Sequence, residues 1–380
     1  MTIFFTLSGF IIHHVYAETF SSGWAPATRS FAVARISRLY PLYIILFIFN
    51  LTMEPMASTL ISKDNLIYLV AYLTGTWTWW PTIIDGQPIF EWQYGISWSI
   101  STELFFYVIY ALVLYRAINI KSLKKSIMLL LGFCLFSVLF FYIVMITRDI
   151  WEAFGLRFFP QFTARNANFT NSFYRWALYI SPYSRVFEFA GGVLACQVFR
   201  LLRQRGIATT RLTLEFLTVS GLLLLLSSVG LLYYYAYHSA WLAAGNMSFG
   251  ALVVNLHMNF LFAPACYVLI ISLALGSSVI GRLLGSRPAV FAGDVSYSTY
   301  LSHQYAEELV GLAGVPFTVA VVLLAAALPT VYLLSWMLYS VVEVPGKRFL
   351  RQALQPRPAV VAAGLEASTV EAGTKSVPNT

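Results

Sequence analysis

Charged residues are scarce in this chain. Aspartate, glutamate, lysine and arginine together make up 11% of its 380 residues, whereas hydrophobic residues make up 59% and aromatic residues 17%. A water-soluble domain of this length does not need so much apolar material to build its core. The shortage of charge therefore excludes a soluble globular protein and indicates a polytopic membrane protein.

Cysteine is also rare. The chain has only Cys134, Cys196 and Cys266, and each lies inside an apolar run without the spacing of metal ligands. We therefore expect small buried side chains at these positions, with no metal site and no disulfide framework. No cleavable signal peptide is expected, because the sequence opens on Ile3-Phe4-Phe5 without a basic segment before them.

Long apolar runs are abundant. A membrane-spanning helix needs roughly 17–25 residues, and runs of about this length occur near 2–18, 38–54, 97–115, 126–147, 183–201, 213–236, 259–278, 289–312 and 317–342. A shorter run, 65–80, ends in Trp77-Thr78-Trp79-Trp80-Pro81, which is typical of an aromatic belt at the membrane interface. The pattern predicts an all-α fold: a transmembrane bundle of about nine spans plus one re-entrant or interfacial helix, over residues 1–350. Residues 351–380, rich in Ala, Gly, Pro, Ser and Thr, are predicted to be a disordered cytoplasmic tail.

Positive charge sets the orientation of these runs. The formal net charge of +8 would suggest nucleic acid as the partner of a soluble chain, but here most lysines and arginines fall between apolar runs. That placement is typical of cytoplasmic loops, so no nucleic acid is implied and the lipid bilayer is the expected partner. If 65–80 crossed the membrane, the arginine-rich turn 200–211 would move outside, against the positive-inside rule. We therefore predict that Met1 lies outside and Thr380 inside.

Arg29, Arg35 and Arg38 form an arginine-rich stretch that we predict to be a short turn between two apolar runs. Arg35 and Arg38 stand at i and i+3, so they share one face of any helical segment. Guanidinium groups bind phosphate oxygens in a bidentate manner, which makes this stretch a candidate anion site. The alternative is that the three arginines only anchor the topology on the cytoplasmic side.

Ionisable residues inside membrane spans are costly and are therefore functional candidates. Glu103, Glu188, Asp294, His303 and Glu343 are of this kind. The predicted orientation places Glu103 and His303 in an outer polar layer, and Glu343 with the three arginines in an inner one. The alternative for each is a structural ion pair or a polar contact between helices.

His13 and His14 follow Ser8-Gly9 and lie in the first apolar run. Histidine titrates near neutrality, so either ring is a candidate proton carrier. Placement at the membrane interface is the simpler interpretation, and it is the one we predict.

Five short motifs occur in a fixed order along the chain. They are Phe4-Phe5-Thr6-Leu7-Ser8-Gly9-Phe10, Arg35-Ile36-Ser37-Arg38-Leu39-Tyr40-Pro41, Ser97-Trp98-Ser99-Ile100-Ser101-Thr102-Glu103-Leu104-Phe105-Phe106-Tyr107, Ser296-Tyr297-Ser298-Thr299-Tyr300-Leu301-Ser302-His303 and Glu343-Val344-Pro345. In these motifs and their order the chain resembles the membrane acyltransferase 3 family, over about residues 3–350. Any one motif would be weak, but the ordered set is specific.

The resemblance implies an integral O-acyltransferase of the inner (plasma) membrane. Such an enzyme moves an acyl group, usually acetyl, from cytoplasmic acyl-CoA to a hydroxyl of an extracytoplasmic glycan or lipid-linked sugar; acyl-CoA is a co-substrate and no cofactor stays bound. By position, the paired arginines of the family match Arg35 and Arg38, to which we add Arg29 for acyl-CoA binding. We expect Glu103 and His303 to be catalytic. The other motif residues are Ser8, Gly9, Trp98, Ser99, Ser296, Tyr297, Glu343 and Pro345.

The chain departs from the family pattern at its start. Family members usually open with a helix that carries an arginine and, about ten residues later, a histidine thought to be the catalytic base. Here the sequence begins where that helix should end, and the predicted topology independently favours one more crossing. We expect this form to lack the base, for which His303 or His14 would be the substitute. A misassigned start codon, a truncated gene or a degenerate family member would each explain this, and an in-frame helix upstream of Met1 would indicate the first.

Two other functions fit polar residues at several membrane depths. One is a transporter or flippase of lipid-linked sugars, in which these residues line a path. The other is a non-catalytic scaffold in a glycan-modifying complex. The ordered motifs favour the acyltransferase.

Overall fold

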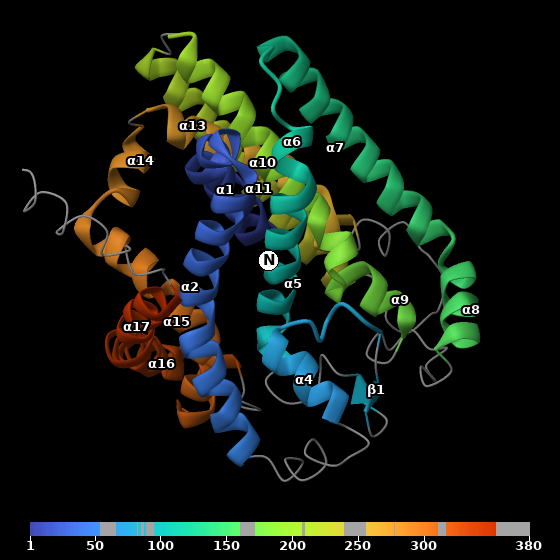
Figure 1. Ribbon diagram of the computed structural model, residues 1–380, viewed down its shortest axis with the longest axis vertical. Helices are drawn as coiled ribbons and strands as arrows, with labels where there is room; N and C mark the ends of the chain where they lie inside the picture. Colours follow the sequence, from blue (N-terminus) through green and yellow to red (C-terminus); the bar gives the residue numbers. More distant parts are fainter. Residues whose placement is uncertain are drawn as a thin grey trace, which may run out of the picture.

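The computed structural model describes residues 1–53, 66–81, 83–84, 87–88, 95–159, 172–206, 210–238, 256–276, 278–310 and 317–354. Within these residues the regular structure is helical apart from β1 (Ile83–Ile84) and β2 (Gln87–Pro88), which pair antiparallel. The predicted all-α membrane bundle is confirmed (Figure 1). The predicted disorder of the tail 351–380 was wrong for residues 351–354, which are helical because α17 continues from Val344 to Leu354. Residues 355–380 lie outside the described residues, so disorder there stays a prediction.

Helices make up most of the described ranges. In chain order they are α1 (Thr2–Ser22), α2 (Trp24–Met53), α4 (Leu66–Thr74), η2 (Gly95–Ser97), α5 (Trp98–Ile109), η3 (Tyr110–Leu114), α6 (Tyr115–Ala117), α7 (Leu123–Ile146), α8 (Arg148–Phe158), α9 (Phe173–Arg175), η5 (Trp176–Ile180), α10 (Pro182–Gln204), α11 (Arg211–His238), η7 (His257–Leu261), α13 (Ala263–Leu275), α14 (Val279–Leu284), α15 (Arg287–Val310), α16 (Phe317–Leu338), η8 (Tyr339–Glu343) and α17 (Val344–Leu354).

Helices occupy all nine ranges that the sequence predicts to span. Five described segments are long and apolar enough to cross a membrane: Trp24–Thr52, Trp98–Ala117, Leu123–Ile146, Arg211–Tyr234 and Ala327–Leu354. The remaining predicted spans are α1, α10, α13 and α15, of which α13 has only 13 residues. A multi-pass membrane protein is therefore shown, and the number of nine crossings stays a prediction.

The run 65–80 forms only a short helix. α4 has nine residues, about 14 Å at the rise of an α-helix, which is too short for a bilayer core. Its aromatic end is partly packed into the protein, because Trp77 is buried and stacks on Tyr72 with ring centroids 4.8 Å apart. Trp80 remains exposed. The prediction that this run does not cross is in keeping with that length.

The arginine-rich stretch is not a turn. α2 is one helix of 30 residues that contains Arg29, Arg35 and Arg38, and the chain turns earlier, at Gly23. The prediction of a turn was wrong because alanine, arginine and leucine in this stretch favour helix, and the polar side chains can line internal cavities instead of leaving the bundle. The helix continues through Pro41, where Gly346 of α17 lies against the proline ring.

α1 and α10 pack closely enough that only glycine fits at their crossing. A β-carbon on Gly9 would lie 2.1 Å from the carbonyl oxygen of Phe189, and one on Gly192 would lie 2.0 Å from that of Thr6. Small residues allow such backbone approach between membrane helices. The contact fixes α1 in the bundle and thereby places its neighbour Ser8.

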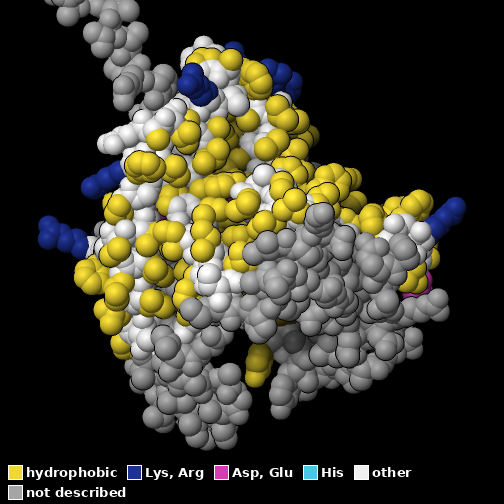
Figure 2. All heavy atoms as spheres, turned by 60° about the horizontal axis from the view of Figure 1, so that its bottom comes forward, with side chains coloured by type: hydrophobic (Ala, Val, Ile, Leu, Met, Phe, Trp, Pro, Cys, Tyr) yellow, Lys and Arg dark blue, Asp and Glu magenta, His cyan; other side chains and the backbone are white. Residues whose placement is uncertain are grey.

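The outer surface is mostly apolar. Figure 2 shows hydrophobic side chains across the coloured part of this face, with lysines and arginines at its edges. Leu131 and Leu135 of α7 and Leu212 and Phe216 of α11 are more than half exposed. A surface of this kind matches a lipid environment rather than water.

Candidate active site

A cavity of about 370 Å³ lies between α1, α2, α5 and α15. Its lining brings together most of the predicted site residues, from motifs far apart in the sequence. These are Ser8, Arg35, Arg38, Ser99, Glu103, Ser296 and Tyr297, and Tyr300 joins them. The size is within the range of small-molecule sites, roughly 300–1,000 Å³.

Glu103 carries the negative charge of this cavity and is buried, with 6% of its surface exposed. Its Oε1 accepts hydrogen bonds from the hydroxyl of Ser8 at 2.8 Å and from that of Tyr107 at 2.6 Å. Tyr107 stands one turn further along α5, so the helix itself supplies one donor, and α1 supplies the other. Oε2 accepts no hydrogen bond from the described residues and is left for a ligand.

Arg35 of α2 lines the same cavity as Glu103. Its guanidinium carbon is 5.1 Å from the ring centroid of Tyr16 and 5.7 Å from those of Phe31 and Tyr107. The side chain is 8% exposed, and its Nε has no hydrogen-bond partner among the described residues. A buried guanidinium with an unused donor is suited to an anion. Arg38, on the same face of α2, lines the cavity as predicted.

The separation into an outer and an inner polar layer is not what the structure shows. Arg35 and Arg38, predicted for the inner layer, line the same cavity as Glu103, predicted for the outer one. The reason is Tyr107, whose hydroxyl holds Glu103 while its ring lies beside the Arg35 guanidinium. Depth along the helices alone does not reveal such a bridge. Arg29 does not line this cavity and faces a second groove.

His303 does not meet Glu103. Its Nδ1–H donates to the carbonyl oxygen of Tyr300 at 2.8 Å, within its own helix, and His303 does not line the cavity. The predicted sharing of one polar layer does not bring the two side chains together, because the His303 ring bonds within its own helix and does not line the cavity. From α15 it is Tyr300 that reaches α5: its hydroxyl accepts from Ser99 at 3.0 Å and donates to the carbonyl of Ile96 at 2.8 Å. The catalytic role of His303 stays a prediction.

The other motif residues mainly hold the helices around the cavity. The hydroxyl of Tyr297 donates to the carbonyl of Leu39 at 2.8 Å, which joins α15 to α2. Glu343 accepts from Ser298 at 2.6 Å, which joins η8 to α15. Trp98 packs against Phe5 and Tyr179.

The two further motif residues are Ser296 and Pro345. Ser296 lines the cavity and donates to the carbonyl of Gly293 within α15. Pro345 is the second residue of α17, directly after η8, in a helical stretch that runs from Ala327 to Leu354.

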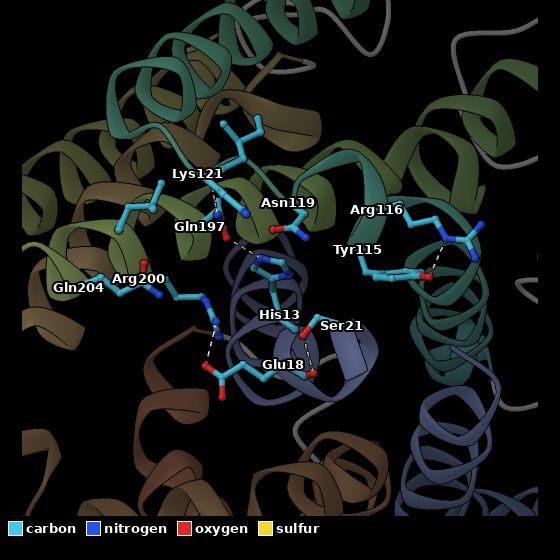
Figure 3. Close-up of a pocket in the computed structure, with 13 residues that line it drawn as sticks. His13, Glu18, Ser21, Tyr115, Arg116, Asn119, Lys121, Gln197, Arg200 and Gln204 are labelled. Carbon is cyan, nitrogen blue, oxygen red and sulfur yellow. Dashed lines mark hydrogen bonds and ion pairs between the residues drawn. The ribbon is translucent and has the colours of Figure 1, made fainter. Parts of the chain in front are cut away.

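His13 is buried inside the protein, which was not predicted from the sequence. Its Nδ1 meets the Tyr110 hydroxyl at 3.1 Å and its Nε2 meets Oε1 of Gln197 at 3.0 Å, and its placement at the membrane interface stays a prediction. Gln197 in turn donates to the carbonyl of Ile120 at 2.6 Å. Figure 3 shows this ring above a pocket of about 520 Å³. The sequence did contain one signal of this burial. His13 follows Gly9 by four residues, so the two share the face of α1 that packs on α10.

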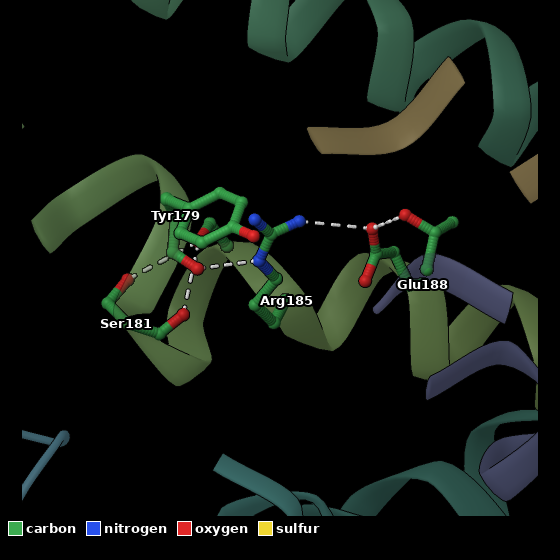
Figure 4. Close-up of polar contacts among 6 residues, drawn as sticks. Tyr179, Ser181, Arg185 and Glu188 are labelled. Carbon is green, nitrogen blue, oxygen red and sulfur yellow. Dashed lines mark hydrogen bonds and ion pairs between the residues drawn. The ribbon is translucent and has the colours of Figure 1, made fainter. Parts of the chain in front are cut away.

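Glu188 belongs to a structural pair, which was the alternative left open for it. Its Oε1 accepts from Arg185 at 3.1 Å and from Thr2 at 2.7 Å, and the Arg185 and Glu188 side chains are 1% and 0% exposed (Figure 4). Arg185 also donates from Nε to the carbonyl of Tyr179 at 2.7 Å and covers the ring of that residue. Tyr179 also packs against Trp98, and neither member of the pair lines the cavity.

Arg185→Met is expected to lower the stability of the folded chain by about 3–5 kcal/mol, because it leaves the charge of Glu188 buried without its partner. The thermal midpoint of the detergent-solubilised chain measures this, and Arg185→Met with Glu188→Gln should recover part of the loss. The matched control is Arg200→Met, whose partner Glu18 is 84% exposed; an exposed pair contributes about 1 kcal/mol or less. Equal midpoints for the two arginine variants would contradict the assignment.

The helices and the cavity thus define a multi-pass membrane protein with a buried polar site. Among models of protein families, the one for the acyltransferase 3 family, described as an acyltransferase domain, matches residues 1–340. The chain therefore belongs to the membrane acyltransferase 3 family, as its motifs predicted. Neither the curated proteins nor the solved structures give a significant match to it.

Proposed function

We propose that this acyltransferase moves an acyl group, in the simplest case acetyl, from cytoplasmic acyl-CoA to a hydroxyl of an extracytoplasmic glycan or lipid-linked sugar, in the plasma (inner) membrane. The observation that carries the proposal is the shared cavity. Its lining holds phosphate-binding side chains, Arg35 and Arg38, together with a carboxylate, Glu103, that has one oxygen available. A donor with anionic phosphates and an acceptor with a hydroxyl need an anion site and a hydrogen-bond acceptor within one connected site.

The chemistry assigns a role to each group. The hydroxyl oxygen of the acceptor forms a bond to the thioester carbonyl carbon, the carbon–sulfur bond breaks, and the hydroxyl proton ends on the CoA thiol. Oε2 of Glu103 accepts the hydrogen bond of the attacking hydroxyl, while Ser8 and Tyr107 hold the carboxylate in place through Oε1. Arg35 and Arg38 hold the phosphates of the donor. Ser99 and Tyr300, joined by a hydrogen bond, are placed to contact the acceptor.

The direct test is transfer of radiolabelled acetyl from acetyl-CoA to glycan. It uses membranes from cells that express the chain from its gene, with the nucleotides upstream of Met1 retained. Label in the glycan fraction that depends on the chain supports the proposal. Transbilayer movement of a lipid-linked sugar without any acetyl transfer would favour the flippase instead.

Arg35→Lys and Arg38→Lys are each expected to raise the acetyl-CoA concentration for half-maximal transfer about tenfold, because lysine keeps the charge but loses the bidentate fork. The measurement is the initial rate of transfer against acetyl-CoA concentration. Arg282→Lys in α14, which lines none of the described cavities, is the control. An unchanged concentration dependence in both cavity variants would leave these arginines as topology anchors.

A further inference from the structure

A second groove lies next to Arg35, because Tyr16, whose ring is 5.1 Å from the Arg35 guanidinium carbon, lines it. It has a volume of about 600 Å³ and is formed by Tyr16 of α1, the first turns of α2, and Arg351 of α17. Ser30 and Arg29 of α2 face it, so hydroxyl and guanidinium groups line a space large enough for a nucleotide.

The charge of this groove is not balanced by the protein. Arg29 and Arg351 reach it from different helices, and its lining contains no carboxylate. Among the described residues neither arginine forms an ion pair, whereas Arg185, Arg200 and Arg211 each have an acidic partner. Two arginines brought together from separate helices without a counter-charge are suited to a multiply charged anion, which each can bind through two N–H groups.

The position of Arg351 is set by helix packing. Gly346 of α17 lies against Pro41 of α2 so closely that a β-carbon would stand 2.5 Å from the proline Cβ. That contact holds α17 beside α2, and Arg351 follows five residues later, near the end of the helix. The arginine is therefore presented to the groove by a fixed element rather than by a loop.

Tyr16 and Arg35 separate the groove from the cavity that holds Glu103. Tyr16 lines the groove, Arg35 lines the cavity, and the guanidinium lies 5.1 Å from the tyrosine ring. The Arg35 side chain is only 8% exposed, and its Nε has no hydrogen-bond partner among the described residues. This unused donor indicates that a ligand group binds at the boundary. A ligand with anionic groups at two separated points along its length matches the arrangement.

We propose that the groove between α2 and α17 binds the nucleotide end of acyl-CoA, with Arg29 and Arg351 on its 3′-phosphate. The chain of the donor then passes Tyr16, its pyrophosphate meets Arg35 and Arg38 where they line the cavity, and the pantetheine arm continues within the cavity toward Glu103. This inference rests on the proposed function, because it takes acyl-CoA as the donor. It adds Arg351 of α17, which is not a motif residue, to the donor site.

Equilibrium binding to the detergent-solubilised full chain tests the groove separately from catalysis. The probes are radiolabelled CoA and 3′-dephospho-CoA, which differ only in the 3′-phosphate. Arg351→Ala and Arg29→Ala are each expected to raise the Kd for CoA about tenfold, the effect of one lost charge-assisted contact, and to change the Kd for dephospho-CoA less than threefold. Arg348→Ala is the matched control, since Arg348 lies on the same helix, is exposed, and does not line the groove.

The outcomes separate the two proposals. CoA binding by the unaltered chain that is insensitive to Arg29→Ala and Arg351→Ala overturns the groove and leaves the proposed function standing. If the arginine variants lose affinity for CoA and for dephospho-CoA by the same factor, the assignment of these arginines to the 3′-phosphate is overturned. No CoA binding by the unaltered chain overturns acyl-CoA as the donor and the groove with it. Arg29, Arg348 and Arg351 are exposed, so their replacement by alanine should leave the chain folded. The size-exclusion elution profile of each variant checks this.

Discussion

Glu103→Gln should abolish acyl transfer while leaving the amount of folded chain in the membrane unchanged. Ser8 and Tyr107 both donate to Oε1, and a glutamine keeps one oxygen that can accept both hydrogen bonds. The substitution therefore preserves the contacts that join α1 to α5. It removes the charge and turns the available Oε2 into a donor, so the acceptor hydroxyl loses the group that orients it. We expect at least a 100-fold lower initial rate, on the scale of general acid–base catalysis.

The control for this variant is Glu18→Gln, which removes an exposed carboxylate of α1 outside the cavity. Its rate should equal that of the unaltered chain. Tyr107→Phe provides a second comparison, since it removes one donor to Oε1 and keeps the charge; we expect partial activity. Full activity of Glu103→Gln would remove the carboxylate from the mechanism. If the Glu103→Gln variant no longer accumulates in the membrane, while the Tyr107→Phe variant does and is fully active, Glu103 is a structural residue.

Gly9→Ala is expected to prevent α1 and α10 from packing as they do. The new methyl group would stand 2.1 Å from the Phe189 carbonyl oxygen, which is backbone and cannot rotate away. The helices must separate, and overpacking of this kind costs typically 1–3 kcal/mol or more. Because Ser8 is the adjacent residue, its hydrogen bond to Glu103 should be lost with the packing. We expect a lower thermal midpoint and little acyl transfer.

Gly132→Ala is the matched control because nothing lies within 4 Å of a β-carbon added there, in the middle of α7. Alanine favours helix over glycine by about 1 kcal/mol, so this control should be neutral or slightly more stable. The two variants make the same chemical change, and their midpoints should move in opposite directions or by clearly different amounts. Equal midpoints would show that the contact of Gly9 with Phe189 does not limit the packing of α1.

Much of the fold could be predicted from local sequence. Apolar runs long enough to span a membrane predict helices, because backbone N–H and C=O groups in lipid must bond to each other. Helices are found in all nine predicted ranges. The face shared by Arg35 and Arg38 follows from helical spacing alone, and both line one cavity. The ordered motifs indicated the family, and the family model matches residues 1–340. These are properties of short segments, which the chain carries whatever its neighbours are.

Partnership between distant residues was decided by tertiary structure. Ser8 and Glu103 are 95 positions apart, and their hydrogen bond exists because Gly9 lets α1 approach α10 beside α5. His13 is buried because Tyr110 and Gln197, from η3 and α10, meet both ring nitrogens, whereas His14, the next residue, stays exposed. Arg351 reaches the groove because Gly346 packs on Pro41. Composition and periodicity determined that the chain forms membrane helices and which faces are polar. Which polar faces meet was left to interhelical packing, because a side chain's burial and partners depend on residues that no local pattern specifies.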